Sequence, residues 1–362
     1  MNLESLTDEE LLKLYKEIET EETQYANKSY AIKILLNAGY GSLSNEFNRF
    51  FADLIAESFT LSGQLSIRTV EIFVNKELNK FMNNAEEVDY ICAIDTDSVY
   101  INLTDVVKKH AGDMNPVDFL EQFSDKVQTW IQQGLEHLYQ QTNVFQKKLF
   151  MSLESIGPAI WIAKKRYVMS LPSFKKIRYN PPKIKVMGIE AVRSSTPLIV
   201  RNWIKDTIPL ALKGDAKSIK DFIDKCWNQY LEQSFATIAM PKGTNDLEKY
   251  MDRQNIYGPK TPIHVRGALL FNDYIKKQGW DKEIDAIKSG DKIKLMYLKR
   301  PNPLMENVIS IPEELPNQLS DFYQYIDYET QFDKTFLDPL KRITNAAGIS
   351  LDSNIIMDQF YG

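Results

Sequence analysis

Residues 89–103, DYICAIDTDSVYINL, hold two short apolar, β-rich runs with an acidic turn between them. This pattern predicts a β-hairpin whose turn carries Asp95 and Asp97. Two carboxylates at i and i+2 lie on one side of an extended chain, where they could share a divalent cation with phosphate oxygens. An EF-hand is excluded, because Tyr100 occupies the loop position that requires glycine. A solvated turn is the alternative, since Asp and Ser are favoured in turns.

Long helical patterns surround this hairpin. A Thr7 cap and spaced apolar residues predict a helix from Leu6 to about Leu36, and a second helix is expected over residues 51–82, beneath a sheet. Further helices are expected over residues 116–139, 197–213, 215–236 and 320–346. Residues 147–189 read as short strands, broken at Gly157-Pro158, Pro172 and Pro181-Pro182. Separate helical and strand-rich segments predict an α+β fold.

The first helical pattern ends in a polar stripe. On a helix, Lys33, Asn37 and Tyr40 lie at i, i+4 and i+7 and therefore share one face. A cation, an amide and a flat aromatic ring suit phosphate, sugar and base respectively. The alternative is a surface lysine followed by a helix stop at Gly39 and Gly41.

A basic stretch lies within the predicted strand-rich segment, at residues 163–185. It contains no acidic residue, and it interleaves Tyr167, Phe174 and Tyr179 with cations. Such a segment is typical of a surface that contacts a polyanion backbone, and a solvated basic hairpin is the alternative. Its cations are Lys164, Lys165, Arg166, Lys175, Lys176, Arg178, Lys183 and Lys185.

An isolated carboxylate, Glu154, lies among apolar neighbours just before the basic stretch. It is a candidate third acidic group near a metal site, and a structural role is the alternative.

Composition bounds the class of protein. The 362 residues, with 43% hydrophobic and 26% charged side chains, indicate a globular chain of more than one module. A formal charge of −5 argues mildly against a surface that is basic throughout. The distant Cys92 and Cys226 indicate neither a zinc site nor a disulfide framework. No signal peptide or membrane-spanning stretch is evident, so we expect a cytoplasmic protein without membrane partners.

In this order, the segments resemble family B replicative DNA polymerases, in particular those of T4-like bacteriophages. The second polymerase motif, Lys-x-x-x-Asn-Ser-x-Tyr-Gly, is similar to residues 33–41, with Ala38 replacing Ser. The third motif, Tyr-Gly-Asp-Thr-Asp-Ser, is similar to residues 93–98, with Ala93 and Ile94 at its start. The family's Lys-Lys-Arg-Tyr element matches residues 164–167 fully.

The resemblance implies a division into domains. Residues 1–45 would form the C-terminal half of the fingers. Residues 46–188 would form part of the palm, an antiparallel sheet backed by helices, and residues 189–362 a mostly helical thumb. The first polymerase motif and the exonuclease are absent from these residues. We therefore expect the C-terminal subunit of a split DNA-directed DNA polymerase, active only with an N-terminal polymerase/exonuclease partner.

The resemblance also implies roles for the motif residues. Asp97, with Asp95 beside it, would bind two catalytic Mg²⁺ ions shared with the partner subunit. Lys33 would neutralise the incoming dNTP, with Asn37 and Tyr40 beside it. The primer–template DNA would be held by Lys164, Lys165 and Arg166, with Tyr167 near the primer end.

The last eight residues resemble the sliding-clamp peptide of the phage enzymes. The residues expected to bind the clamp are Ile356, Met357, Phe360 and Tyr361. Simple disorder is the alternative for this tail. For the whole chain, the competing hypothesis is a non-catalytic, clamp-recruiting DNA-binding remnant, because Ala38, Ala93 and Ile94 depart from the motifs.

Overall fold

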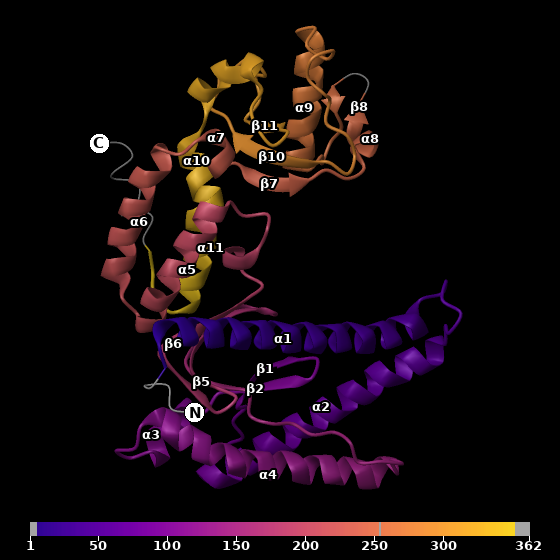
Figure 1. The fold of residues 1–362 in the computed structure, drawn as a ribbon, viewed down its shortest axis with the longest axis vertical. Coiled ribbons are helices and arrows are strands. Elements are labelled where there is room, and N and C mark those ends of the chain that lie inside the picture. Colours follow the sequence, from indigo (N-terminus) through magenta and orange to yellow (C-terminus); the bar gives the residue numbers. More distant parts are fainter. Residues whose placement is uncertain (1–5, 253–254, 352–362) are drawn as a thin grey trace. The chain divides into compact units, whose positions relative to one another are not determined.

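The computed structural model describes residues 6–252 and 255–351 (Figure 1). The chain forms two compact units. Unit 1 comprises Met1–Asp113 and Phe123–Ser152, and unit 2 comprises Met114–Gln122 and Leu153–Gly362. Helices and small antiparallel sheets occur in separate stretches of the chain, which confirms the α+β class.

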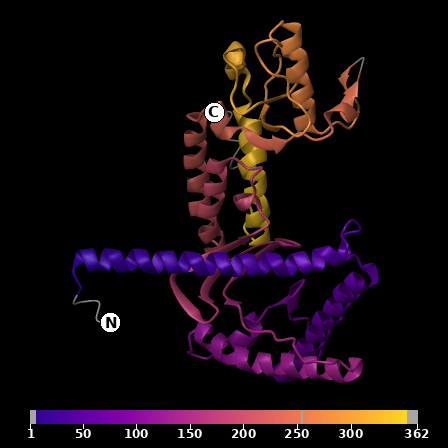
Figure 2. The same ribbon diagram turned by 45° about the vertical axis from the view of Figure 1, so that its right-hand side comes forward.

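Unit 1 begins with two long helices, α1 (Asp8–Ser44) and α2 (Asp53–Met82). A capping box starts α1, because the Thr7 side chain and Glu10 satisfy each other's backbone N–H groups. Figures 1 and 2 show α1 as one long helix from whose end α2 turns away. The helix continues through Gly39 and Gly41, so the alternative of a helix stop at these glycines is wrong.

The predicted hairpin is confirmed as β1 (Ile91–Asp95) and β2 (Ser98–Ile101). It packs on α2, where Asn75 Oδ1 accepts a 2.8 Å hydrogen bond from the Tyr90 N–H. The short helix α3 (Thr104–His110) follows. The expected helix over residues 116–139 is α4 (Pro116–Thr142), and its Phe123 and Trp130 pack around Phe81 of α2.

Unit 2 contains the sheet predicted within residues 147–189. Its strands are β3 (Ser155–Ile156), β4 (Ala159–Ala163), β5 (Arg166–Phe174) and β6 (Ile177–Met187). The strand order is β3-β5-β4, and β6 also pairs with β5. Pro172 and Pro181-Pro182 lie inside β5 and β6, so the predicted breaks there are wrong. The β5–β6 ladder is irregular at both sites, because Leu171 pairs with Lys183 and Ser173 with Arg178, which leaves Pro172 and residues 179–182 outside the register.

The rest of unit 2 is mostly helical, with a second small sheet of order β11-β10-β7. The helices predicted over residues 197–213 and 215–236 are α5 and α6, and α6 ends earlier than expected, at Leu231. Buried side chains from α5, α6, α9 and α11 form one core with Ile160 and Val168 of the first sheet. The elements in chain order are η2 (Glu190–Val192), α5 (Leu198–Lys213), α6 (Ala216–Leu231), α7 (Phe235–Ile238), β7 (Met240–Gly243), α8 (Leu247–Tyr250), β8 (Met251–Asp252), β9 (Ile256–Tyr257), α9 (Ile263–Lys277), β10 (Lys292–Tyr297), β11 (Val308–Ile311), η3 (Asn317–Tyr325), α10 (Tyr328–Phe332), η4 (Asp333–Leu337) and α11 (Asp338–Ala346).

The division into two compact units does not test the predicted domain boundaries after residues 45 and 188. The division into fingers, palm and thumb stays a prediction. Within the described ranges, no helix combines the length and hydropathy needed to span a bilayer.

Candidate metal and nucleic-acid sites

The acidic turn closes the β1–β2 hairpin in unit 1. Asp95 pairs with Ser98, so Thr96 and Asp97 form the turn itself. Thr96 adopts a left-handed φ of 58°, which is unusual for a β-branched residue. The Asp97 N–H donates to the Asp95 carbonyl at 2.7 Å, and the Thr96 hydroxyl donates to Asp95 Oδ1 at 3.2 Å.

The i, i+2 spacing predicted that the carboxylates of Asp95 and Asp97 lie on one side of an extended strand. The structure differs, because the chain reverses between them at Thr96, which adopts a left-handed conformation in the tight turn. Asp97 is exposed and Asp95 is partly buried at the end of β1. The branched Ile94 is accommodated within β1, opposite Val99.

The oxygen donors of this turn suit a hard divalent cation, since Mg²⁺ is typically bound by one or two carboxylates. Within the part of the chain that the structure describes, no three His, Cys, Asp or Glu side chains gather as a metal site. The carboxylates of Asp95 and Asp97 are hard oxygen donors of the kind that suits Mg²⁺, and they are two of the several ligands that such an ion takes.

The polar stripe of Lys33, Asn37 and Tyr40 lies within α1, and all three residues are exposed. Their i, i+4 and i+7 spacing on a continuous helix places them on one face, as predicted. Lys33 is thereby available to solvent-borne anions.

The Lys-Lys-Arg-Tyr element forms a second tight hairpin, in unit 2. Ala163 of β4 pairs with Arg166 of β5, so Lys164 and Lys165 are the turn residues. Both turn lysines, which we call the basic turn, are exposed, and Lys165 has a left-handed φ of 61°. The turn thus places two exposed lysines at the end of the β4–β5 strand pair.

Tyr167 does not lie on the surface. Its side chain is 3% exposed, and its ring centroid lies 4.3 Å from that of Trp161. Lys185 of β6 lies over the Tyr167 ring at 6.0 Å. Trp161 is a residue that the sequence analysis missed. Its place in the apolar run just before the turn lysines is the sequence signal for it, because a turn at Lys164 and Lys165 brings Trp161 opposite Tyr167.

Both arginines of the basic stretch form ion pairs with carboxylates. Arg166 Nη2 donates to the two carboxylate oxygens of Glu190 at 2.8 and 2.7 Å. Arg178 bridges Asp118 and Glu121 at the start of α4. The hydrogen bond from the Ser173 hydroxyl is the main reason that the pKa of Glu121 lies below its usual value. Burial opposes this shift, and the Arg178 guanidinium lowers the pKa further. These arginines are therefore less accessible to a ligand than the sequence alone indicated.

The sequence of this chain matches a known protein family over most of its length. A model of DNA polymerase family B matches residues 9–345. The chain belongs to DNA polymerase family B. This membership confirms the resemblance that the three ordered motifs indicated.

Family B relatives from bacteriophages align with most of the chain. A DNA-directed DNA polymerase of Enterobacteria phage T4 is 29% identical over 99% of this chain and 41% of its own length. A DNA-directed DNA polymerase of Escherichia phage RB69 is 30% identical over 91% of this chain and 38% of its own length. The chain therefore spans about two fifths of the length of these relatives.

The roles of all the predicted site residues stay predictions within this family B chain. Glu154 is exposed and belongs to unit 2, whereas Asp95 and Asp97 belong to unit 1. The predicted clamp-binding residues lie outside the described residues, and these are Ile356, Met357, Phe360 and Tyr361.

Proposed function

We propose that this chain is the C-terminal part of a DNA-directed DNA polymerase that transfers nucleotides to a primer 3′-hydroxyl. The observation that carries the proposal is the Asp95–Ser98 turn, which lies in the same compact unit as the exposed stripe of Lys33, Asn37 and Tyr40. Family membership and the printed activity of the phage relatives support it.

In this proposal, the acidic turn contributes part of a magnesium site. Asp97 is the principal metal ligand because its carboxylate is exposed on the turn, and Asp95 supports it from the strand end. The chemistry that two bound divalent cations supply is activation of the primer 3′-hydroxyl and charge neutralisation in the in-line transition state. Thr96 orients the Asp95 carboxylate through its hydroxyl.

The exposed stripe on α1 binds the incoming dNTP. Lys33 neutralises the triphosphate, so that negative charge developing on the departing pyrophosphate is stabilised. Asn37 donates to phosphate oxygens. Tyr40, which is 43% exposed, offers an aromatic surface to the nascent base pair.

The basic turn binds the backbone of the primer–template duplex. Lys164 and Lys165 extend from its tip, where they can approach phosphates without reading the sequence. Tyr167, packed against Trp161, serves as a fixed support for the turn beside the primer end. A copying enzyme needs this kind of contact, because it must hold every sequence equally.

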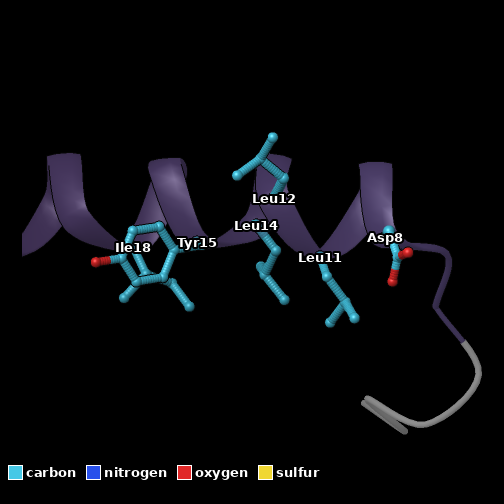
Figure 3. A pocket seen from close by; sticks show the side chains of 6 residues that line it. All are labelled: Asp8, Leu11, Leu12, Leu14, Tyr15 and Ile18. Atoms are coloured by element: carbon cyan, nitrogen blue, oxygen red, sulfur yellow. The ribbon is translucent and has the colours of Figure 1, made fainter.

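Residues outside the 362 of this sequence complete the enzyme in this proposal. We assign the first polymerase motif and the exonuclease to an N-terminal partner subunit, which supplies the other metal-binding carboxylate. Helix α1 has no buried residue among those described, and Figure 3 shows an apolar group of its side chains around Leu11, Tyr15 and Ile18. Such a surface suits an apolar helix of the partner. We place the assembled enzyme in the cytoplasm, which is that of the host cell if the chain is encoded by a phage, with a sliding clamp bound to its C-terminal tail.

Primer extension with purified components tests the proposal. This chain alone should not extend a primer, whereas addition of a polypeptide carrying the first motif should restore Mg²⁺-dependent synthesis. Extension by the chain alone would refute the shared metal site. DNA binding without synthesis in the mixture would favour the clamp-recruiting remnant instead.

A further inference from the structure

The Arg166 side chain is enclosed by protein rather than presented to solvent. Its guanidinium contacts both oxygens of Glu190, and the two side chains are 21% and 15% exposed. A second guanidinium, Arg342 of α11, lies 3.5 Å from Glu190 and is 54% exposed. Glu190 therefore joins the first strand residue after the basic turn to a helix from the C-terminal part of unit 2.

The segment that carries Glu190 also packs closely on the basic turn. Gly188 approaches the Lys165 carbonyl so tightly that a Cβ at this position would lie 2.2 Å from the oxygen. The Arg193 guanidinium holds the same segment, since its Nε donates to the Gly188 carbonyl at 3.0 Å. Backbone and side-chain contacts thus fix the turn on residues 188–193.

Contact with a DNA phosphate through Nη2 would require Arg166 to leave Glu190, because both hydrogen bonds to this carboxylate come from Nη2. A mostly buried carboxylate would then lose its closest cation, which is strongly unfavourable. Lys164 has no such constraint, because it is exposed at the tip of the turn.

We propose that Arg166 is a positioning residue that anchors the basic turn through Glu190 and does not itself neutralise a DNA phosphate. The proposal rests on the proposed function in one respect, namely that the basic turn binds duplex DNA. Arg166 then sets where the turn lysines meet the duplex, and Glu190 assists DNA binding although its charge repels DNA.

Whether Glu190→Gln weakens or tightens binding to duplex DNA tests the proposed anchoring role of Arg166. The dissociation constant of the full chain for a fluorescent primer–template duplex is measured by anisotropy at one fixed salt concentration. The anchor predicts that Glu190→Gln and Arg166→Gln each weaken binding by about threefold to tenfold. If Arg166 binds phosphate, Glu190→Gln frees it, and binding becomes tighter. Tighter binding would overturn the proposal.

A matched control removes the same charge elsewhere in unit 2. Glu313 is exposed, and Glu313→Gln changes net charge as Glu190→Gln does. It should leave affinity unchanged or slightly increased, as electrostatics alone predicts. Weakening of the same size in Glu313→Gln would refute a specific anchor.

Coupling to the turn distinguishes positioning from general damage to the fold. If Glu190 acts through the basic turn, Lys164→Gln should cost less affinity in the Glu190→Gln background than in the parent chain. Equal losses in both backgrounds would contradict the proposal. An Lys164→Gln variant that binds like the parent would instead refute the proposed DNA-binding role of the turn.

Discussion

Replacing Gly188 with alanine probes the close contact beneath the basic turn. Gly188 has a left-handed φ of 63°, and an added Cβ would lie 2.2 Å from the Lys165 carbonyl oxygen. Gly214, at the end of α5, provides a matched control, because its φ is 74° and a Cβ there meets nothing within 4 Å. Both substitutions place alanine in a left-handed backbone conformation, but only Gly188→Ala also brings a Cβ into steric contact with a neighbouring atom.

The geometry sets the expected magnitudes. Alanine in the left-handed region costs about 1–2 kcal/mol, and this applies to both glycines. At Gly188 the new contact must also open from 2.2 Å to at least 3.4 Å before it becomes ordinary. Overpacking of this kind adds about 1–3 kcal/mol. We therefore expect Gly188→Ala to lower the free energy of unfolding by about 2–5 kcal/mol, and Gly214→Ala by about 1–2 kcal/mol.

Urea unfolding followed by tryptophan fluorescence measures this difference. Most tryptophans report on unit 2, and these are Trp161, Trp203, Trp227 and Trp280. A larger midpoint shift for Gly188→Ala, with an unchanged slope, is the expected result. Equal midpoint shifts for the two variants would show that residues 188–193 do not constrain the turn as described.

Further predictions concern the acidic turn, the α4 ion pair and the C-terminal tail. Asp97→Asn should reduce primer extension of the assembled enzyme by about 100-fold or more, with DNA affinity preserved, whereas Asp113→Asn, an exposed control, should retain activity. Because the folded-state pKa of Glu121 is lowered, its charge stabilises the fold above the unfolded-state pKa and this contribution is lost as pH falls. Glu121→Gln should therefore lower the urea midpoint at pH 7, and its deficit should shrink below about pH 4.3; a deficit independent of pH would refute the assignment. Removal of residues 355–362 should abolish stimulation by a sliding clamp and spare distributive synthesis, and clamp-stimulated synthesis by the truncated chain would contradict the tail's role.

Periodicity and turn chemistry predicted most of the fold correctly. The hairpin around Asp95 and the long helices follow from local patterns, which depend little on the rest of the chain. Local signals failed where tertiary context decides. Gly41 continues α1 although glycine is a weak helix former, and Pro172 sits within β5 because a register shift accommodates it.

The sequence predicted which residues form the candidate sites, but it did not predict their burial or their ion-pair partners. The sequence placed Arg166 among eight cations without an acidic neighbour. Its partner Glu190 lies 24 residues later and reaches it only because β6 returns beside β5. Burial of Tyr167 likewise depends on Trp161 across the hairpin. Counting positive charges along the sequence therefore gives too large a number of cations that a ligand can reach.

The left-handed Thr96 has a consequence for engineering this chain. Glycine or asparagine adopts that conformation more easily than a β-branched residue, so substitution there should relieve backbone strain. Glycine would also remove the hydroxyl that donates to Asp95. A selection for thermal tolerance alone would thus favour loss of the native residue beside the carboxylates that we propose as metal ligands. Libraries aimed at a more robust polymerase should hold position 96 constant.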